Sequence, residues 1–113
     1  MKISIVTPFY NEELGIDGYF AVMIPILNNL GMEYEIIAVE DGSKDGTYEA
    51  LREKSIKIKQ LKIIKFSRNF GKEIAVTAGI DYTTGDAVIP MDADLQDSPE
   101  VLPTLIEKWK EGY

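Results

Sequence analysis

The fold class is decided by the stretch YEIIAVEDGSKDGT, residues 34–47. Its first part, Tyr34–Val39, is rich in β-branched residues and contains an unbroken apolar run at positions 36–39. Such a run is typical of a strand in a parallel sheet that is covered on both faces. The second part is rich in Gly, Asp and Ser, which form turns. The stretch therefore predicts a buried parallel strand followed by a polar loop.

Three other runs share this β-branched character and are bounded by turn residues: Lys2–Thr7, Leu61–Phe66 and Ala87–Met91. Apolar residues at three- and four-residue spacing predict a helix that begins near Ile16 and ends at Gly31. Pro25 lies inside that stretch and is expected to kink or shorten the helix. Further helices are predicted over residues 47–54, 71–81 and 98–110.

Strands that alternate with helices indicate a parallel sheet with right-handed crossovers. We therefore expect an α/β fold, a Rossmann-like parallel sheet of about four strands with helices on both faces. Residues 1–113 are expected to form one domain. Ligands of such sheets bind beyond the carboxyl ends of the strands, so the residues that follow each strand are the candidates for function.

Composition excludes several classes of protein. The 113 residues include no Cys and no His, which rules out a disulfide framework, a zinc finger and a histidine-dependent nucleophile. The formal net charge of -7 argues against nucleic acid or an anionic membrane as a partner, although a phosphorylated ligand bound through a metal stays compatible with it. The longest apolar run, Tyr19–Leu27, is shorter than the roughly 20 residues of a membrane-spanning helix.

The loop after the fourth strand carries the most specific signal. Asp92 and Asp94 leave a buried strand two residues apart, so both side chains can point the same way at the edge of the sheet. Two carboxylates ~5 Å apart repel by ~3 kcal/mol at an effective dielectric constant of ~20, a cost that a divalent cation removes. Oxygen ligands suit Mg²⁺ or Mn²⁺, and Gln96 adds a carbonyl oxygen. The alternative is a solvated turn whose acids cap the next helix.

Two other loops offer groups for a nucleotide. In the second, Asp41 and Ser43 supply acceptors for a base N–H and for ribose hydroxyls. The same two residues also suit a simple turn that caps the next helix, and both roles are compatible. In the third, Arg68 and Lys72 stand at the start of a helix, where they can meet a diphosphate. Their alternative is that of two ordinary surface cations.

Together the four loops resemble the nucleotide-sugar half of inverting family 2 glycosyltransferases with the GT-A fold. The third and fourth segments resemble the polyprenyl-phosphate branch, which comprises dolichol-phosphate mannose synthases and bactoprenol glucosyltransferases. The four matching segments are Thr7–Glu12, Glu40–Thr47, Ser67–Lys72 and Asp92–Asp97.

The resemblance implies roles for individual residues. Four of them would hold the nucleoside: Pro8, Tyr10, Glu12 and Asp41. Arg68 and Lys72 would lie near the phosphates. The metal, Mg²⁺ or Mn²⁺, would be held by Asp92, Asp94 and Gln96. The chain departs from the family pattern at Glu40, where an Asp is common, so a ligand role for Glu40 is left open.

The resemblance also implies an activity, the transfer of a sugar from a UDP- or GDP-sugar to a polyprenyl phosphate. Family members are longer and carry an acceptor-side half, so residues 1–113 are expected to be an N-terminal, nucleotide-sugar-binding piece. The full-length enzyme is expected at the cytoplasmic face of the membrane. The piece alone is expected to be soluble and to bind nucleotide with little turnover, and homo-oligomerisation is left open. The alternatives are a phospho-acceptor signalling domain, a nucleotidyltransferase and a non-catalytic nucleotide-binding remnant.

Overall fold

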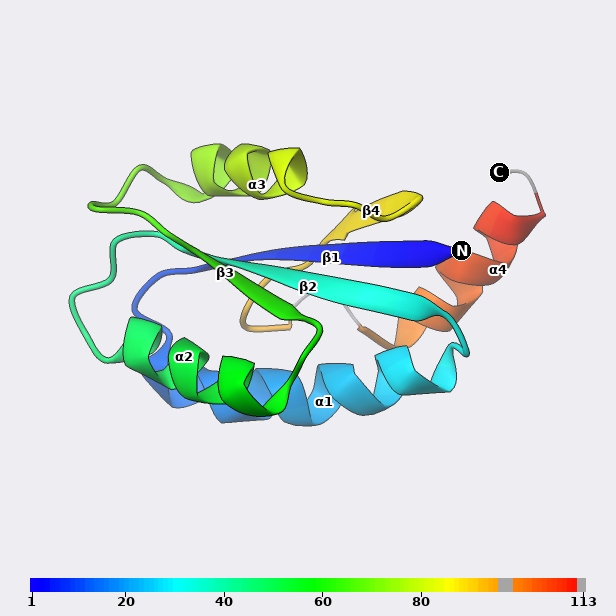
Figure 1. Cartoon of the computed structure of the whole chain (residues 1–113), viewed down its shortest axis with the longest axis horizontal. Coiled ribbons are helices and arrows are strands. Elements are labelled where there is room, and N and C mark those ends of the chain that lie inside the picture. The colour runs from blue at the N-terminus through cyan, green and yellow to red at the C-terminus, as the bar shows by residue number, and fades with distance from the viewer. Residues whose placement is uncertain (96–98, 112–113) are drawn as a thin grey trace.

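A four-stranded parallel sheet forms the centre of the structure, a computed structural model that describes residues 1–95 and 99–111. The strands are β1 (Lys2–Phe9), β2 (Glu33–Glu40), β3 (Leu61–Lys65) and β4 (Ala87–Pro90). Their order across the sheet is β3-β2-β1-β4, and all three neighbouring pairs are parallel (Figure 1). The order reverses at β1, which has β2 on one side and β4 on the other. A reversal of this kind opens a crevice at the carboxyl ends of the strands.

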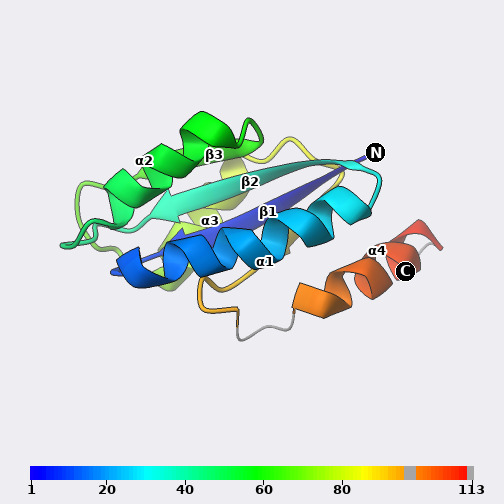
Figure 2. The ribbon, with the colours of Figure 1, turned by 90° about the horizontal axis from the view of Figure 1, so that it is seen from below.

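Helices cover both faces of the sheet, as the sequence predicts (Figures 1 and 2). Helix α3 (Lys72–Asp81) lies on one face, and α1 (Ile16–Asn29) and α2 (Thr47–Lys57) lie on the other. Two short 3-10 turns complete the described elements: η1 (Glu13–Gly15) before α1, and η2 (Pro99–Val101) before α4 (Leu102–Lys110). Among the described residues, no helix has the length and apolar character to cross a membrane.

Helix α1 continues through Pro25 to Asn29, so of the two expected effects of this proline, a kink or a shorter helix, the second is wrong and the first stays a prediction. Proline removes only one hydrogen bond of the helix. Met23 and Leu27 flank Pro25 and are fully buried against the sheet. Burial of two such side chains contributes roughly 3–6 kcal/mol, which offsets the loss of that bond.

Alternate residues of the strands point to two separate apolar layers. Ile5 of β1 belongs to the larger layer under α1, α2 and α4, whereas Val6 belongs to the smaller layer under α3. Helix α3 approaches the sheet closely at Gly79, where a Cβ atom would lie 2.5 Å from Cγ1 of Val6. Close packing on both faces fixes the strands, and with them the loops that follow their carboxyl ends.

The amino end of the sheet is held by a buried carboxylate, Glu35 of β2, which is 1% exposed. Its oxygens accept hydrogen bonds from Ser4 Oγ (2.6 Å), Lys62 Nζ (2.8 Å) and both the N–H (2.6 Å) and Oγ1 (3.1 Å) of Thr84. Burial alone raises the pKa of a carboxyl group, but these hydrogen bonds outweigh it and lower the pKa of Glu35 to about 2. Glu35 therefore links β1, β2, β3 and the segment before β4 as a fixed anion.

Candidate functional site

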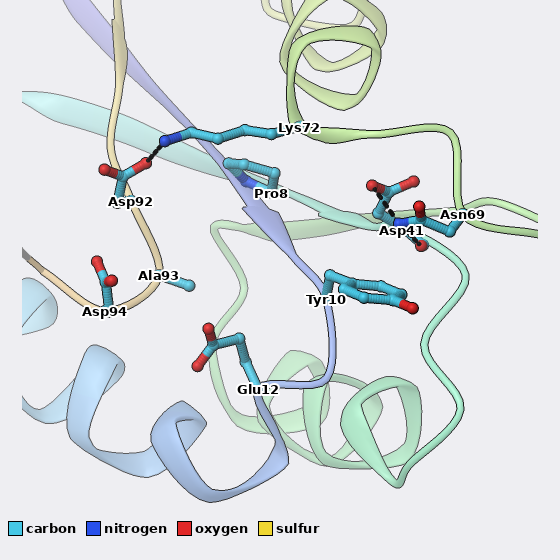
Figure 3. Close-up of a pocket in the computed structure, with 9 residues that line it drawn as sticks. All are labelled: Pro8, Tyr10, Glu12, Asp41, Asn69, Lys72, Asp92, Ala93 and Asp94. Carbon is cyan, nitrogen blue, oxygen red and sulfur yellow. Dashed lines mark hydrogen bonds and ion pairs between the residues drawn. The ribbon is translucent and has the colours of Figure 1, made fainter.

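A cavity of about 280 Å³ opens at the carboxyl ends of the strands, beside the reversal at β1 (Figure 3). Each of the four loops that follow a strand contributes to it. The lining residues are Pro8, Tyr10, Glu12, Asp41, Asn69, Lys72, Asp92, Ala93 and Asp94. The sequence-based expectation that the four loops meet at one rim is therefore confirmed.

Seven of the residues singled out from the sequence line this cavity: Pro8, Tyr10, Glu12, Asp41, Lys72, Asp92 and Asp94. Ser43 and Arg68 are not among the lining residues. The Ser43 Oγ accepts a hydrogen bond from the Asn11 N–H (2.9 Å), and the Arg68 guanidinium lies 4.8 Å from the centre of the Phe70 ring. Gln96 falls outside the described residues.

Asp41 is held in place by the third loop. It is 2% exposed, and its carboxylate accepts hydrogen bonds from the N–H groups of Phe70 (2.8 Å) and Gly71 (3.1 Å) and from Asn69 Nδ2 (3.0 Å). Asn69 Nδ2 also lies 3.2 Å from the Asp41 carbonyl oxygen. The orientation of Asp41 is thus set before any ligand arrives.

The role of Asn69 was not foreseen from the sequence. The residue stands within the third segment, but nothing in its spacing distinguishes a side chain that orients an acid from one exposed to solvent. Its partner Asp41 is 28 positions earlier in the chain. Only the pairing of β2 with β3 brings the loops after these strands together.

The second and third loops touch through their backbones at Gly42. This residue has a φ of +70°, and a Cβ atom on it would lie 2.1 Å from the carbonyl carbon of Arg68. Only glycine fits such a position. Next to it, Glu40 is 1% exposed and accepts a hydrogen bond from the Ser43 N–H (2.7 Å), so its carboxylate holds the turn.

The opposite side of the cavity is crowded with negative charge. Figure 3 shows the carboxylates of Glu12, Asp92 and Asp94 along this side, with the Lys72 side chain extending to Asp92. Lys72 Nζ and Asp92 Oδ1 form an ion pair in which the side chains are 63% and 24% exposed. Burial raises the pKa of Glu12, and the negative charges of Asp94 and Asp45 raise it further. The carboxylates on this side therefore repel one another.

The donors on this side suit a divalent cation by their chemistry. Within residues 1–95 and 99–111, no cluster of three or more His, Cys, Asp or Glu side chains is arranged to hold a metal ion. Asp92 and Asp94 offer two carboxylates, and Lys72 already places a positive charge on one of them. A pair of carboxylates that leaves positions for water and phosphate oxygens is how Mg²⁺ is usually bound beside a nucleotide.

The family model for glycosyl transferase family 2 matches residues 4–113 of this chain. An uncharacterized glycosyltransferase of Synechocystis sp. is 53% identical over 113 residues, which are all of this chain and 36% of that protein. A bactoprenol glucosyl transferase of Shigella phage SfX is 46% identical over 112 residues, 99% of this chain and 37% of the relative. The chain thus spans about a third of the length of these curated relatives.

Solved structures share the fold. The mannosyltransferase PcManGT from Pyrobaculum calidifontis, in complex with GDP-Man and Mn²⁺, superposes with a TM-score of 0.75 at 22% identity. That match covers 93% of this chain and 31% of the mannosyltransferase. A crystal structure of S. aureus TarS residues 1–349 superposes with a TM-score of 0.73 at 24% identity, over 98% of this chain and 33% of TarS.

Proposed function

This chain belongs to glycosyl transferase family 2, and from that premise we propose that it forms the donor-binding part of an enzyme that transfers a sugar from a nucleoside diphosphate sugar to a polyprenyl phosphate. Membership in the family decides against the phospho-acceptor domain and the nucleotidyltransferase. The identity of 46% to a bactoprenol glucosyl transferase supports the polyprenyl-phosphate acceptor. Because such an acceptor resides in a membrane, the full-length enzyme is proposed to act at the cytoplasmic face.

The observation that carries this proposal is the rim cavity to which all four loops contribute. The two sides of the cavity differ in chemistry, as do the nucleoside and the diphosphate of the proposed ligand. Tyr10 is 41% exposed and offers an aromatic face to a base, and the fixed Asp41 offers an acceptor for a base or ribose donor. Pro8 completes this nucleoside side, Glu12 is proposed to contact the nucleoside from the charged side, and Lys72 can reach the phosphates.

A divalent cation, Mg²⁺ or Mn²⁺, is proposed at Asp92 and Asp94, with Gln96 as a further ligand outside the described residues. When bound, it stabilises the negative charge that develops on the nucleoside diphosphate leaving group. The role of the two carboxylates is to hold the ion at the mouth of the cavity. The acceptor phosphate is already an anion, so the reaction needs no strong general base, in agreement with a chain that has no His.

Titration with Mn²⁺ together with UDP or GDP tests the proposal directly. We expect nucleotide binding that depends on Mn²⁺ and weakens on the order of 10–100-fold or more in Asp94→Asn, since the loss of even an outer-shell partner of a metal costs that much. The matched control is Asp81→Asn, which removes the same charge from the exposed far end of α3. Metal-dependent binding that survives unchanged in Asp94→Asn would contradict the metal assignment. If neither nucleotide binds, the donor-site assignment is wrong.

A further inference from the structure

The ion pair between Lys72 and Asp92 spans the mouth of the cavity. Lys72 is the first residue of α3, and Asp92 follows β4 on the other side of the opening (Figure 3). The helix dipole disfavours a cation at this end of a helix. The contact with Asp92 compensates for that unfavourable position. It also places the ammonium group on a carboxylate oxygen that a metal ion would need.

The charge balance of the cavity makes this arrangement significant. Among the residues that the structure describes, four carboxylates and one ammonium group line it, and these groups have a formal net charge of -3. A diphosphate anion that enters such a cavity is repelled unless a cation enters with it. A divalent cation at Asp92 in turn meets the positive charge of Lys72. The structure with Lys72 on Asp92 is therefore suited to the ligand-free state and opposes a metal that arrives alone.

We infer that Lys72 and the divalent cation compete for Asp92, and that the donor diphosphate resolves this competition by drawing the Lys72 ammonium group onto its own oxygens. The inference rests on the proposed function. Lys72 then acts as a positioning residue that couples the binding of metal to the binding of donor. Because coupling free energies are reciprocal, bound nucleotide tightens metal binding through Lys72 by the same factor as bound metal tightens nucleotide binding.

The geometry permits this exchange without a change of fold. The Lys72 side chain is 63% exposed, and partly solvated ion pairs are weak enough to be replaced by a stronger partner. Its four-carbon stem moves the charge by rotation about side-chain bonds, while the backbone of α3 stays in place. Phosphate oxygens at the start of α3 would also meet the favourable end of the helix dipole.

Binding measurements on Lys72→Met test the inference, with Lys59→Met as the control because Lys59 is exposed in the turn before β3. Mn²⁺ is titrated alone, with free Mn²⁺ followed by electron paramagnetic resonance. We expect Lys72→Met to bind Mn²⁺ roughly three- to tenfold more tightly than the unmodified chain, since a competing cation has been removed. Lys72→Arg keeps the charge and should bind Mn²⁺ with the affinity of the unmodified chain. The control Lys59→Met should do the same.

The second measurement titrates UDP and GDP in the presence of saturating Mn²⁺. Here Lys72→Met should bind the nucleotide that the unmodified chain prefers roughly tenfold more weakly, because a charge-assisted contact to phosphate is lost. Two effects of opposite sign from one substitution are the signature of the exchange. If Lys72 were merely structural, the substitution would weaken both the Mn²⁺ and the nucleotide affinity, or neither. Urea unfolding of each variant shows that it is folded.

The outcomes separate the inference from the proposed function. Equal or weaker Mn²⁺ binding by Lys72→Met, beside normal metal-dependent nucleotide binding by the unmodified chain, overturns the inference and leaves the proposed function in place. If neither the unmodified chain nor Lys72→Met binds Mn²⁺ or nucleotide, the proposed function fails and the inference fails with it. Tighter Mn²⁺ binding with weaker nucleotide binding confirms the exchange.

Discussion

Carboxylates at the two ends of the same sheet have opposite surroundings. At the amino end, Glu35 is buried and receives hydrogen bonds from Ser4, Lys62 and Thr84, which lower its pKa to about 2. At the carboxyl end, Glu12 faces Asp94, and its pKa is raised by burial and by neighbouring negative charge. Both residues are glutamates, so the difference comes from what the fold places around each carboxylate.

This difference separates a carboxylate that is already stabilised by donors from one that lies among like charges. A carboxylate surrounded by fixed donors gains nothing from a cation and holds the elements around it together. Carboxylates that face one another store repulsion that a cation can relieve. The rim contains carboxylates of both kinds. That of Asp41 is of the first kind, because it accepts hydrogen bonds from two backbone N–H groups and from the Asn69 amide. The rim thus combines a side on which Asp41 is fixed by hydrogen-bond donors with a side on which Glu12 and Asp94 repel each other.

Removal of the Glu35 carboxylate should have the largest effect. In Glu35→Ala, four hydrogen bonds to a buried charged group are lost, and we expect a loss of about 3–5 kcal/mol in the free energy of unfolding. The control Glu33→Ala changes an exposed acid two residues earlier on β2 and should stay within about 0.5 kcal/mol. Urea unfolding measures both. A loss below about 1 kcal/mol in Glu35→Ala would mean that this carboxylate does not hold the sheet.

The same carboxylate should make stability depend on pH. Its pKa is lowered from an ordinary 4.5 to about 2, so the unfolded chain takes up the proton at a higher pH than the folded chain. The contribution of Glu35 is therefore complete above pH 4.5 and is lost as the pH falls from 4.5 to 2. From this shift we expect Glu35 to contribute about 3 kcal/mol to the free energy of unfolding above pH 4.5. Other acids also titrate in this range, so the measure is the difference in unfolding free energy between the unmodified chain and Glu35→Gln at each pH. A difference that stays constant with pH would contradict the assignment of this pH dependence to Glu35.

A series of three glycines tests how the fixed side of the rim is built. Gly42→Ala should cost about 2–3 kcal/mol, because it combines a positive φ with a clash against the Arg68 backbone. Gly31 has a φ of +67° but open space around it, so Gly31→Ala isolates the conformational cost of about 1 kcal/mol. Gly18 lies inside α1 with open space, and Gly18→Ala should stabilise by about 0.5–1 kcal/mol. Equal costs at Gly42 and Gly31 would show that the two loops can separate freely.

Much of the fold could be predicted because the signals for it are local. The apolar run of β2 and the turn residues after it lie within one stretch, and all four strands were placed within a few residues of their observed limits. Pro25 does not shorten α1, because the effect of a proline is local, whereas the packing of Met23 and Leu27 that holds the helix together is not. Side-chain periodicity alone does not give the strength of such packing.

The site was predictable at the level of loops and not at the level of partners. The parallel sheet brings the four loops together, which is why seven singled-out residues line one cavity. Three pairings depend on contacts between residues distant in the chain and left no trace in the spacing: Asn69 with Asp41, Ser43 with Asn11, and Lys72 with Asp92. The last of these gives Asp92, for which a metal was predicted, an additional partner in the ammonium group of Lys72.

The smallest expected effect comes from the charged side of the rim. Glu12→Gln removes one of the repelling charges and should raise the free energy of unfolding at pH 7 by about 0.5 kcal/mol, the scale of interactions between partly exposed charges. The neighbouring control Glu13→Gln should bring no gain, because a Glu13 oxygen already accepts a hydrogen bond from the Gly46 N–H (3.0 Å). The gain at Glu12 should shrink in high salt, which screens exposed charges. It should shrink further with saturating Mn²⁺, because a cation at Asp94 relieves the same repulsion that the substitution removes. Urea unfolding with and without Mn²⁺ measures this, and a destabilised Glu12→Gln would show that Glu12 is held by donors in the way that Glu35 is.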